Sequence, residues 1–174
     1  MKEVRSRILK TITVIVVAIL FAALETTLLS GLPLFGATPH LLPFLAAAVA
    51  VFEGPFPGLV TGFFVGFLMD GLGAKSLWWY TVFYLATAGI VGLLSPNWFR
   101  KRTVTAMLWG TLILFLGEFL RFFANFYLFS RSDMSPVVTL LLPQAAYSVI
   151  LSPLVIWPVS WLNHHYAKEP GLFR

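Results

Sequence analysis

The sequence predicts an all-α membrane protein, a compact bundle of six transmembrane helices in which residues 1–174 form a single integral membrane domain. Of the 174 residues, 59% are hydrophobic and only 11% are charged, whereas ordinary soluble domains contain about 25% charged residues. Two further observations support this class. One is a row of small residues at every fourth position of an apolar segment, and the other is an alternating distribution of basic residues along the chain.

The row of small residues consists of Gly54, Gly58, Gly62 and Gly66, and Asp70 follows at the same spacing. Four residues advance slightly more than one helical turn, so these positions lie almost above one another on one face. In water each internal glycine would cost a helix about 1 kcal/mol relative to alanine. In a bilayer, small residues at this spacing let two helix backbones pack closely. We therefore expect a helix-packing surface at Gly58, Gly62 and Gly66, on a helix central to the bundle.

Six apolar segments have the composition of membrane spans, which need about 20 apolar residues each. The second segment is short for a full crossing. Pro39 and Pro43 mark its start, and Pro55 and Pro57 mark the turn into the third segment. The expected spans cover about residues 9–29, 39–53, 56–72, 77–96, 104–129 and 137–162.

The basic residues define an orientation for these spans. If the N-terminus is cytoplasmic, the outer loops contain only Lys75 and Arg131 as basic residues, as the positive-inside rule requires. Merging the second and third spans would place residues 100–102 outside, so six spans fit better than five. Both termini are then cytoplasmic. The basic residues expected at the inner membrane surface are Lys2, Arg5, Arg7, Lys10, Arg100, Lys101 and Arg102, with Lys168 and Arg174 in the C-terminal tail.

Four ionisable residues fall within the apolar segments: Glu25, Asp70, Glu118 and Arg121. At about 1.5 Å per residue, the three acids all lie in the outer third of the bilayer. Arg121 follows Glu118 by three residues and can pair with it on the same helix face. Charges at this depth suggest a functional site, here a polar cluster between the first, third and fifth spans that holds the bundle together or lines a small pocket. The alternative is that these side chains reach headgroups or water. Glu53, at the inner surface, is expected to cap a helix end or to be solvated.

No sequence motif points to catalysis. Serine-hydrolase, zinc-protease and phosphate-binding patterns are all missing from the sequence, and the chain contains no cysteine for thiolate chemistry. The basic runs lack the interleaved aromatic residues of a nucleic-acid surface. We therefore expect a non-enzymatic protein of the lipid bilayer, with no cofactor, no metal and no nucleic-acid partner.

Residues 38–92 carry a recognisable pattern: a Pro-initiated second span, a Gly-Pro turn, and a glycine-rich third span that ends in an acid. The residues concerned are Thr38, Pro39, His40, Leu41, Glu53, Gly54, Pro55, Gly58, Gly62, Gly66, Phe67, Asp70, Gly71, Tyr80, Tyr84, Gly89 and Gly92. This pattern is similar to the rod shape-determining MreD family of bacteria. A polar residue late in the first span, here Glu25, also agrees. His40 departs from the family, which usually has Asp at this position.

The resemblance implies a non-enzymatic scaffold in the bacterial cytoplasmic membrane that helps to control cell shape and peptidoglycan synthesis. MreD-like proteins pair with MreC, a bitopic membrane protein. Together they link MreB filaments to the synthase formed by RodA and a class B penicillin-binding protein. The resemblance also implies the six-helix fold of the substrate-binding subunits of energy-coupling-factor transporters.

That fold supplies the main alternative function, a substrate-binding subunit of an energy-coupling-factor-type vitamin transporter. Ala18 and Ala22 form an Ala-x-x-x-Ala step in the first span, similar to the step that docks the coupling subunit in those transporters. Ordinary helix packing explains such a step equally well. A vitamin site needs several convergent polar groups in an enclosed pocket, and the outer loops here are short. A carrier of lipid-linked precursors is a third interpretation, but no internal repeat of the kind expected in transporters is evident.

Overall fold

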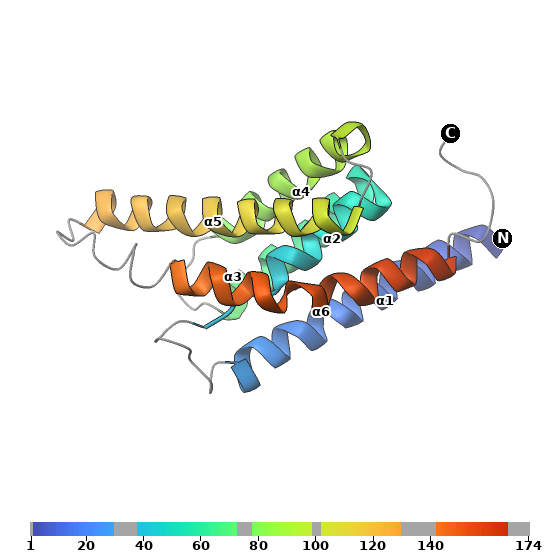
Figure 1. The fold of residues 1–174 in the computed structure, drawn as a ribbon, viewed down its shortest axis with the longest axis horizontal. Helices are drawn as coiled ribbons and strands as arrows, with labels where there is room; N and C mark the ends of the chain where they lie inside the picture. The colour runs from blue at the N-terminus through green and yellow to red at the C-terminus, as the bar shows by residue number, and fades with distance from the viewer. Residues whose placement is uncertain (1, 30–37, 73–77, 99–101, 130–141, 167–174) are drawn as a thin grey trace.

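The computed structural model describes residues 2–29, 38–72, 78–98, 102–129 and 142–166, which are almost entirely helical and contain no β-strand. This confirms the predicted all-helical class. The chain direction reverses from each helix to the next, so the start of α1 and the end of α6 lie at the same end of the molecule (Figure 1). The helices are α1 (Lys2–Leu24), which continues into a short π-helix η1 (Glu25–Leu29), α2 (Leu42–Glu53), α3 (Pro55–Leu72), α4 (Trp79–Trp98), α5 (Arg102–Phe129) and α6 (Leu142–Tyr166).

Three of these helices are long and apolar enough to cross a membrane, through the segments Pro55–Leu72, Thr103–Arg121 and Leu142–His164. The corresponding segments of α1, α2 and α4 are shorter. Six spans were predicted, so by this measure the prediction holds for three helices only. The apolar segments of the other three helices are short for different reasons. The first turns of α1 carry charges, and proline and glycine limit α2 to 12 residues. In α4, polar residues follow the apolar part.

The boundaries of α2 follow from its flanking residues. Pro43 lies in the first turn, where a backbone N–H has no partner within the helix, so the missing N–H of proline costs nothing. At the other end Gly54 adopts φ 96°, a left-handed conformation that favours glycine, and its N–H donates to the Ala50 carbonyl at 3.1 Å. Pro55 then begins α3. The second and third helices therefore form a tight hairpin.

The central helix is α2, which corrects the expectation that the glycine-rich helix is central. Every residue of α2 from Leu42 to Phe52 is buried, and α2 packs against each of the other five α-helices. By contrast, α3 buries one stripe and exposes Phe56, Phe63 and Phe67. The stripe consists of Gly58, Thr61, Gly62, Val65, Gly66 and Met69.

The glycine row of α3 lies where helix backbones come closest. A Cβ at Gly58 would lie 2.8 Å from the Cβ of Ala50 in α2, and a Cβ at Gly62 would lie 2.9 Å from the Cβ of Ala88 in α4. A Cβ at Gly66 would overlap the backbone at the start of α4. Larger residues would therefore separate α3 from α4, as expected for a small-residue packing surface.

The Ala18–Ala22 step of α1 is also buried between helices of the bundle. Ala18 and Ala22 are 1% and 4% exposed, and together with Val14 they form a buried stripe at a spacing of four residues. This helix packs against α2, α3 and α6. The step is therefore covered by the chain's own helices.

The five outer helices present large apolar side chains outward. Soluble monomers rarely expose apolar surface over such an area, whereas a lipid-facing surface is expected to be apolar. Examples are Leu20 on α1, Phe56 on α3, Val82 and Leu93 on α4, Leu108 on α5, and Ile150 and Trp157 on α6, each more than half exposed.

Candidate functional site

The four ionisable residues predicted to cluster lie in two groups, each built at the start of a helix. Glu25 lies at the start of α2, whereas Asp70, Glu118 and Arg121 gather around the start of α4. Because the chain direction alternates, both helix starts lie at the same end of the bundle (Figure 1). The first four N–H groups of a helix have no partner within that helix, so both places require hydrogen-bond acceptors.

Glu25 provides the acceptor at the start of α2. The residue is 8% exposed, and its Oε2 accepts a hydrogen bond from the backbone N–H of Leu41 at 3.1 Å. Oε1 contacts Nδ1 of His40. Leu41 is the N-cap residue and has no capping side chain. The acid therefore replaces the missing cap, and its negative charge lies at the positive end of the helix dipole.

A second partner of this segment comes from α6. The backbone N–H of His40 donates to Oγ of Ser148 at 2.9 Å, and that hydroxyl donates to the Gln144 carbonyl at 2.7 Å. Ser148 is fully buried. Buried backbone N–H groups outside a helix need a hydrogen-bond partner from elsewhere in the protein. Residues from both ends of the chain therefore hold residues 38–41 in place.

Asp70 performs the same task at the start of α4. Its two carboxylate oxygens accept from the backbone N–H groups of Tyr80 at 3.2 Å and Thr81 at 2.8 Å. The Thr81 hydroxyl donates to the same carboxylate at 2.6 Å. Asp70 thus ends the glycine row of α3 by capping the helix against which that row packs.

Tyr80 joins Asp70 to Glu118. The Tyr80 hydroxyl donates to Oε1 of Glu118 at 2.8 Å, and Glu118 is 7% exposed. Arg121 lies 3.5 Å from Oε2 of Glu118 through its Nε atom, and its guanidinium carbon lies 5.7 Å from the centre of the Tyr80 ring. The half-exposed Arg121 therefore balances the charge of a buried carboxylate and lies against an aromatic ring.

An aromatic pair extends the second group into the bundle. Tyr84 is 1% exposed and stacks on Tyr80 with ring centres 5.7 Å apart. One end of the bundle therefore contains both polar groups, which together are called the polar network below.

The sequence indicated the acids but not their partners. Tyr80 and His40 appeared only as parts of a family pattern, and Thr81 and Ser148 did not appear as candidates. A hydroxyl at the start of a helix suggests a capping role in general, but the pairing of Thr81 with Asp70, 11 residues away, and of Ser148 with His40, 108 residues away, depends on tertiary structure. All three acids accept hydrogen bonds from the chain itself, so the network can join helices without any ligand.

The other predicted site residues fall into two sets. Gly58, Gly62, Gly66, Ala18 and Ala22 lie at helix contacts, as described above. The membrane-surface residues Lys2, Arg5, Arg7 and Lys10 lie in α1 and Arg102 begins α5, but their side chains lie outside the described part, as do Arg100 and Lys101 entirely. Within the described ranges, no three His, Cys, Asp or Glu residues gather as metal ligands.

Comparison with protein-family models, curated proteins and solved structures found no match to this chain.

Proposed function

We propose that the protein is a multi-pass scaffold of the bacterial cytoplasmic membrane that acts by binding, as a component of the cell-elongation machinery. Its six helices cross the membrane with both termini inside. An outer apolar face holds the single membrane span of an MreC-like partner. Through that partner it connects with RodA, its class B penicillin-binding protein and MreB filaments, and so helps to control cell shape and peptidoglycan synthesis.

The main support is the packing role of the residues that resemble the family pattern. The Gly-Pro turn, the glycine row and the terminal acid join α2, α3 and α4 into one closely packed unit, through the turn at Gly54, the contact at Gly62 and the cap from Asp70. These residues build a rigid body. The apolar surfaces of the outer helices are left for lipid and for partner helices.

The proposed membrane placement has independent support from the length of α2 and from its burial. The helix α2 covers only about 18 Å at 1.5 Å per residue, against about 30 Å for a hydrocarbon core, but it touches no lipid because it is buried on every side. Polar side chains satisfy the non-helical residues that precede it. A short second helix is therefore compatible with six spans.

The vitamin-transporter alternative gains no support from the site. Each of the three outer acids accepts hydrogen bonds from the chain's own groups. The Ala18–Ala22 step is buried against the chain's own helices, so a coupling subunit has no access to it. We therefore propose the scaffold function alone.

The first test is affinity purification of the tagged protein from its native membrane in mild detergent, followed by mass spectrometry. We expect an MreC-like bitopic protein and cell-wall synthases. Recovery of an ATPase pair with a coupling subunit would contradict the proposal.

A second step identifies the helix that faces the partner. A photo-crosslinking amino acid is placed singly at Leu20, Val82, Leu108 and Ile150, which are exposed on four different helices, and at the fully buried Ala47 as the control. We expect a crosslink to the bitopic partner from one or two adjacent helices and none from Ala47. Equal crosslinking from all four exposed positions would indicate non-specific contact.

A further inference from the structure

The start of α2 is held by a carboxylate that also contacts a histidine. Oε1 of Glu25 contacts Nδ1 of His40, while Oε2 accepts from the N–H of Leu41. The side chain of Glu25 is 9% exposed and that of His40 is 24% exposed. The carboxylate is therefore shielded by protein, whereas part of the histidine ring remains accessible to protons from the surface.

Histidine is the side chain whose charge ordinarily changes between about pH 5 and about pH 8. The chain contains three histidines and no cysteine. One of the others, His164, is exposed near the end of α6, where its Nδ1 lies 2.9 Å from the Ser160 carbonyl. Among the side chains that the structure describes, His40 is thus the histidine that contacts a buried carboxylate.

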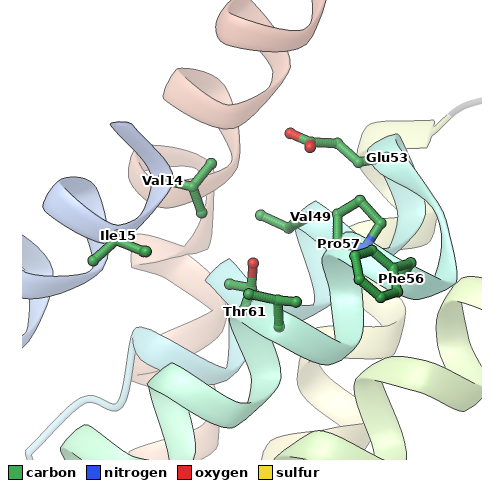
Figure 2. Close-up of a pocket in the computed structure, with 8 residues that line it drawn as sticks. Val14, Ile15, Val49, Glu53, Phe56, Pro57 and Thr61 are labelled. Atoms are coloured by element: carbon green, nitrogen blue, oxygen red, sulfur yellow. The ribbon is translucent and has the colours of Figure 1, made fainter. Parts of the chain in front are cut away.

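The opposite end of α2 has a carboxylate but no histidine beside it. Glu53 lies there, at the edge of a pocket between α1, α2 and α3 (Figure 2). The other residues that line this pocket are apolar apart from Thr61, and none of them titrates. A pH change that titrates histidine therefore acts on the start of α2 and not on this pocket.

The other charged groups at the start of α2 are balanced by partners of their own. Glu118 and Arg121 form an ion pair at 3.5 Å, and Asp70 accepts from the backbone of α4. The tyrosines at this end, Tyr80 and Tyr84 of α4, keep their protons at neutral pH, and α6 contributes the hydroxyl of Ser148. Within the described ranges no lysine or arginine contacts Glu25, so its balancing charge comes from His40.

Protonation of His40 changes the nature of this contact. When the ring is protonated, the contact is an ion pair, which is stronger than a hydrogen bond between neutral groups. When the ring is neutral, Nδ1 can still donate, but the buried carboxylate keeps its charge without a counter-charge, which is costly. The contact therefore stabilises the start of α2 most at pH values below the titration of histidine and above that of glutamate. Its contribution is lost as pH rises through the titration of His40.

We propose that the contact between Glu25 and His40 is a pH-responsive latch, which holds the start of α2 firmly when His40 is protonated and loosely when it is neutral. The latch joins η1 to residues 38–41, and Ser148 joins the same residues to α6. A looser latch therefore acts where η1, α2 and α6 meet. In the orientation of the proposed function this junction faces the outside of the cell, but the latch itself does not depend on that orientation.

Hydrogen exchange of the full chain in mild detergent tests the latch, with protection factors corrected for the intrinsic pH dependence of exchange. The reporters are Leu41, Phe44 and Leu45, whose N–H groups donate to Glu25 or to the Leu41 carbonyl. We expect their protection to fall about tenfold between about pH 5.5 and about pH 8, the change that corresponds to weakening one charge-assisted hydrogen bond.

The start of α4 is the internal control, because Asp70 caps Tyr80 and Thr81 there without a histidine. Protection at these two amides should stay nearly constant over the same pH range. Constant protection at the start of α2, or an equal fall at both helix starts, would overturn the proposal.

Three variants identify the groups responsible. His40→Gln removes the titrating ring but keeps the backbone N–H that donates to Ser148, and Glu25→Gln removes the charge but keeps an acceptor; both should abolish the fall in protection. His164→Gln is the matched control and should retain it. A fall that persists in either of the first two variants, or that disappears in His164→Gln, would contradict the latch.

If the first two variants do not fold, the comparison of the two helix starts in the wild type decides alone. The exchange measurement needs no partner protein, and the partner purification does not depend on the latch. Failure of one proposal is therefore distinguishable from failure of the other.

Discussion

The second and third helices are joined by one turn at Gly54, yet they are buried in different ways. The short, alanine-rich α2 has no exposed face, whereas the glycine-rich α3 is buried along one stripe and exposed along the other. The glycine row therefore marks where two backbones touch, at the contact between α3 and α4. It does not mark the centre of the bundle. The centre is occupied by the helix that is apolar on all sides and too short to cross the membrane alone.

The largest expected effect comes from Gly62→Leu, which tests the backbone contact. The new side chain would meet the backbone of Tyr84 and the Cβ of Ala88, and backbone cannot move aside as a flexible side chain can. We expect a loss of about 3 kcal/mol, the upper end for overpacking, measured by thermal unfolding in detergent. Gly71→Leu is the control, because a Cβ at Gly71 would meet nothing within 4 Å. Similar melting of both variants would contradict a close contact between α3 and α4.

An intermediate effect is expected from Phe44→Ala, which compares the two helices directly. Phe44 is fully buried in α2, and its ring packs over Gly110 of α5. We expect a loss of about 2 kcal/mol, below the 3–5 kcal/mol seen in soluble cores, because a lipid environment removes most of the hydrophobic term. The matched variant Phe63→Ala removes a ring that is 41% exposed on α3 and should leave unfolding almost unchanged. Equal losses would contradict the central position of α2.

The smallest effect is expected from Glu25→Ala, which tests how the start of α2 is held. The substitution leaves the buried N–H of Leu41 without its acceptor and His40 without its carboxylate. We expect a loss of about 1.5 kcal/mol, near the upper limit for polar contacts in membrane bundles. Hydrogen exchange of residues 38–45 should increase more than that of α4. An exchange increase spread evenly over all helices would indicate a general rather than a local role.

The helical class and the position of each helix could be predicted from the sequence because both depend on local composition. The contact surface at Gly58, Gly62 and Gly66 was predictable for the same reason, since it follows from spacing along one helix. The centre of the bundle was not. In a membrane protein, apolar side chains are found both facing lipid and in the core. The hydrophobicity of α2 alone therefore does not distinguish a central helix from a lipid-facing one.

The candidate site was predictable by residue but not by arrangement. Depth along each helix indicated that Glu25, Asp70 and Glu118 lie at one end, and the structure describes all three in polar groups at the same end of the bundle. Their partners come from other helices, as with Ser148 of α6 and Tyr80 of α4. The residues predicted to form a single cluster thus lie at two helix starts, because Glu25 and Asp70 each accept from nearby N–H groups that lack a partner within their own helix.

The hydrogen bond between His40 and Ser148 has a consequence for biosynthesis. During synthesis, α3 and α4 emerge consecutively and can pack as soon as both have formed, since their contact is local in sequence. Completion of the start of α2 must wait for α6, which leaves the ribosome after α3, α4 and α5, because Ser148 follows His40 by 108 residues. An unfinished chain therefore has an incompletely satisfied second helix.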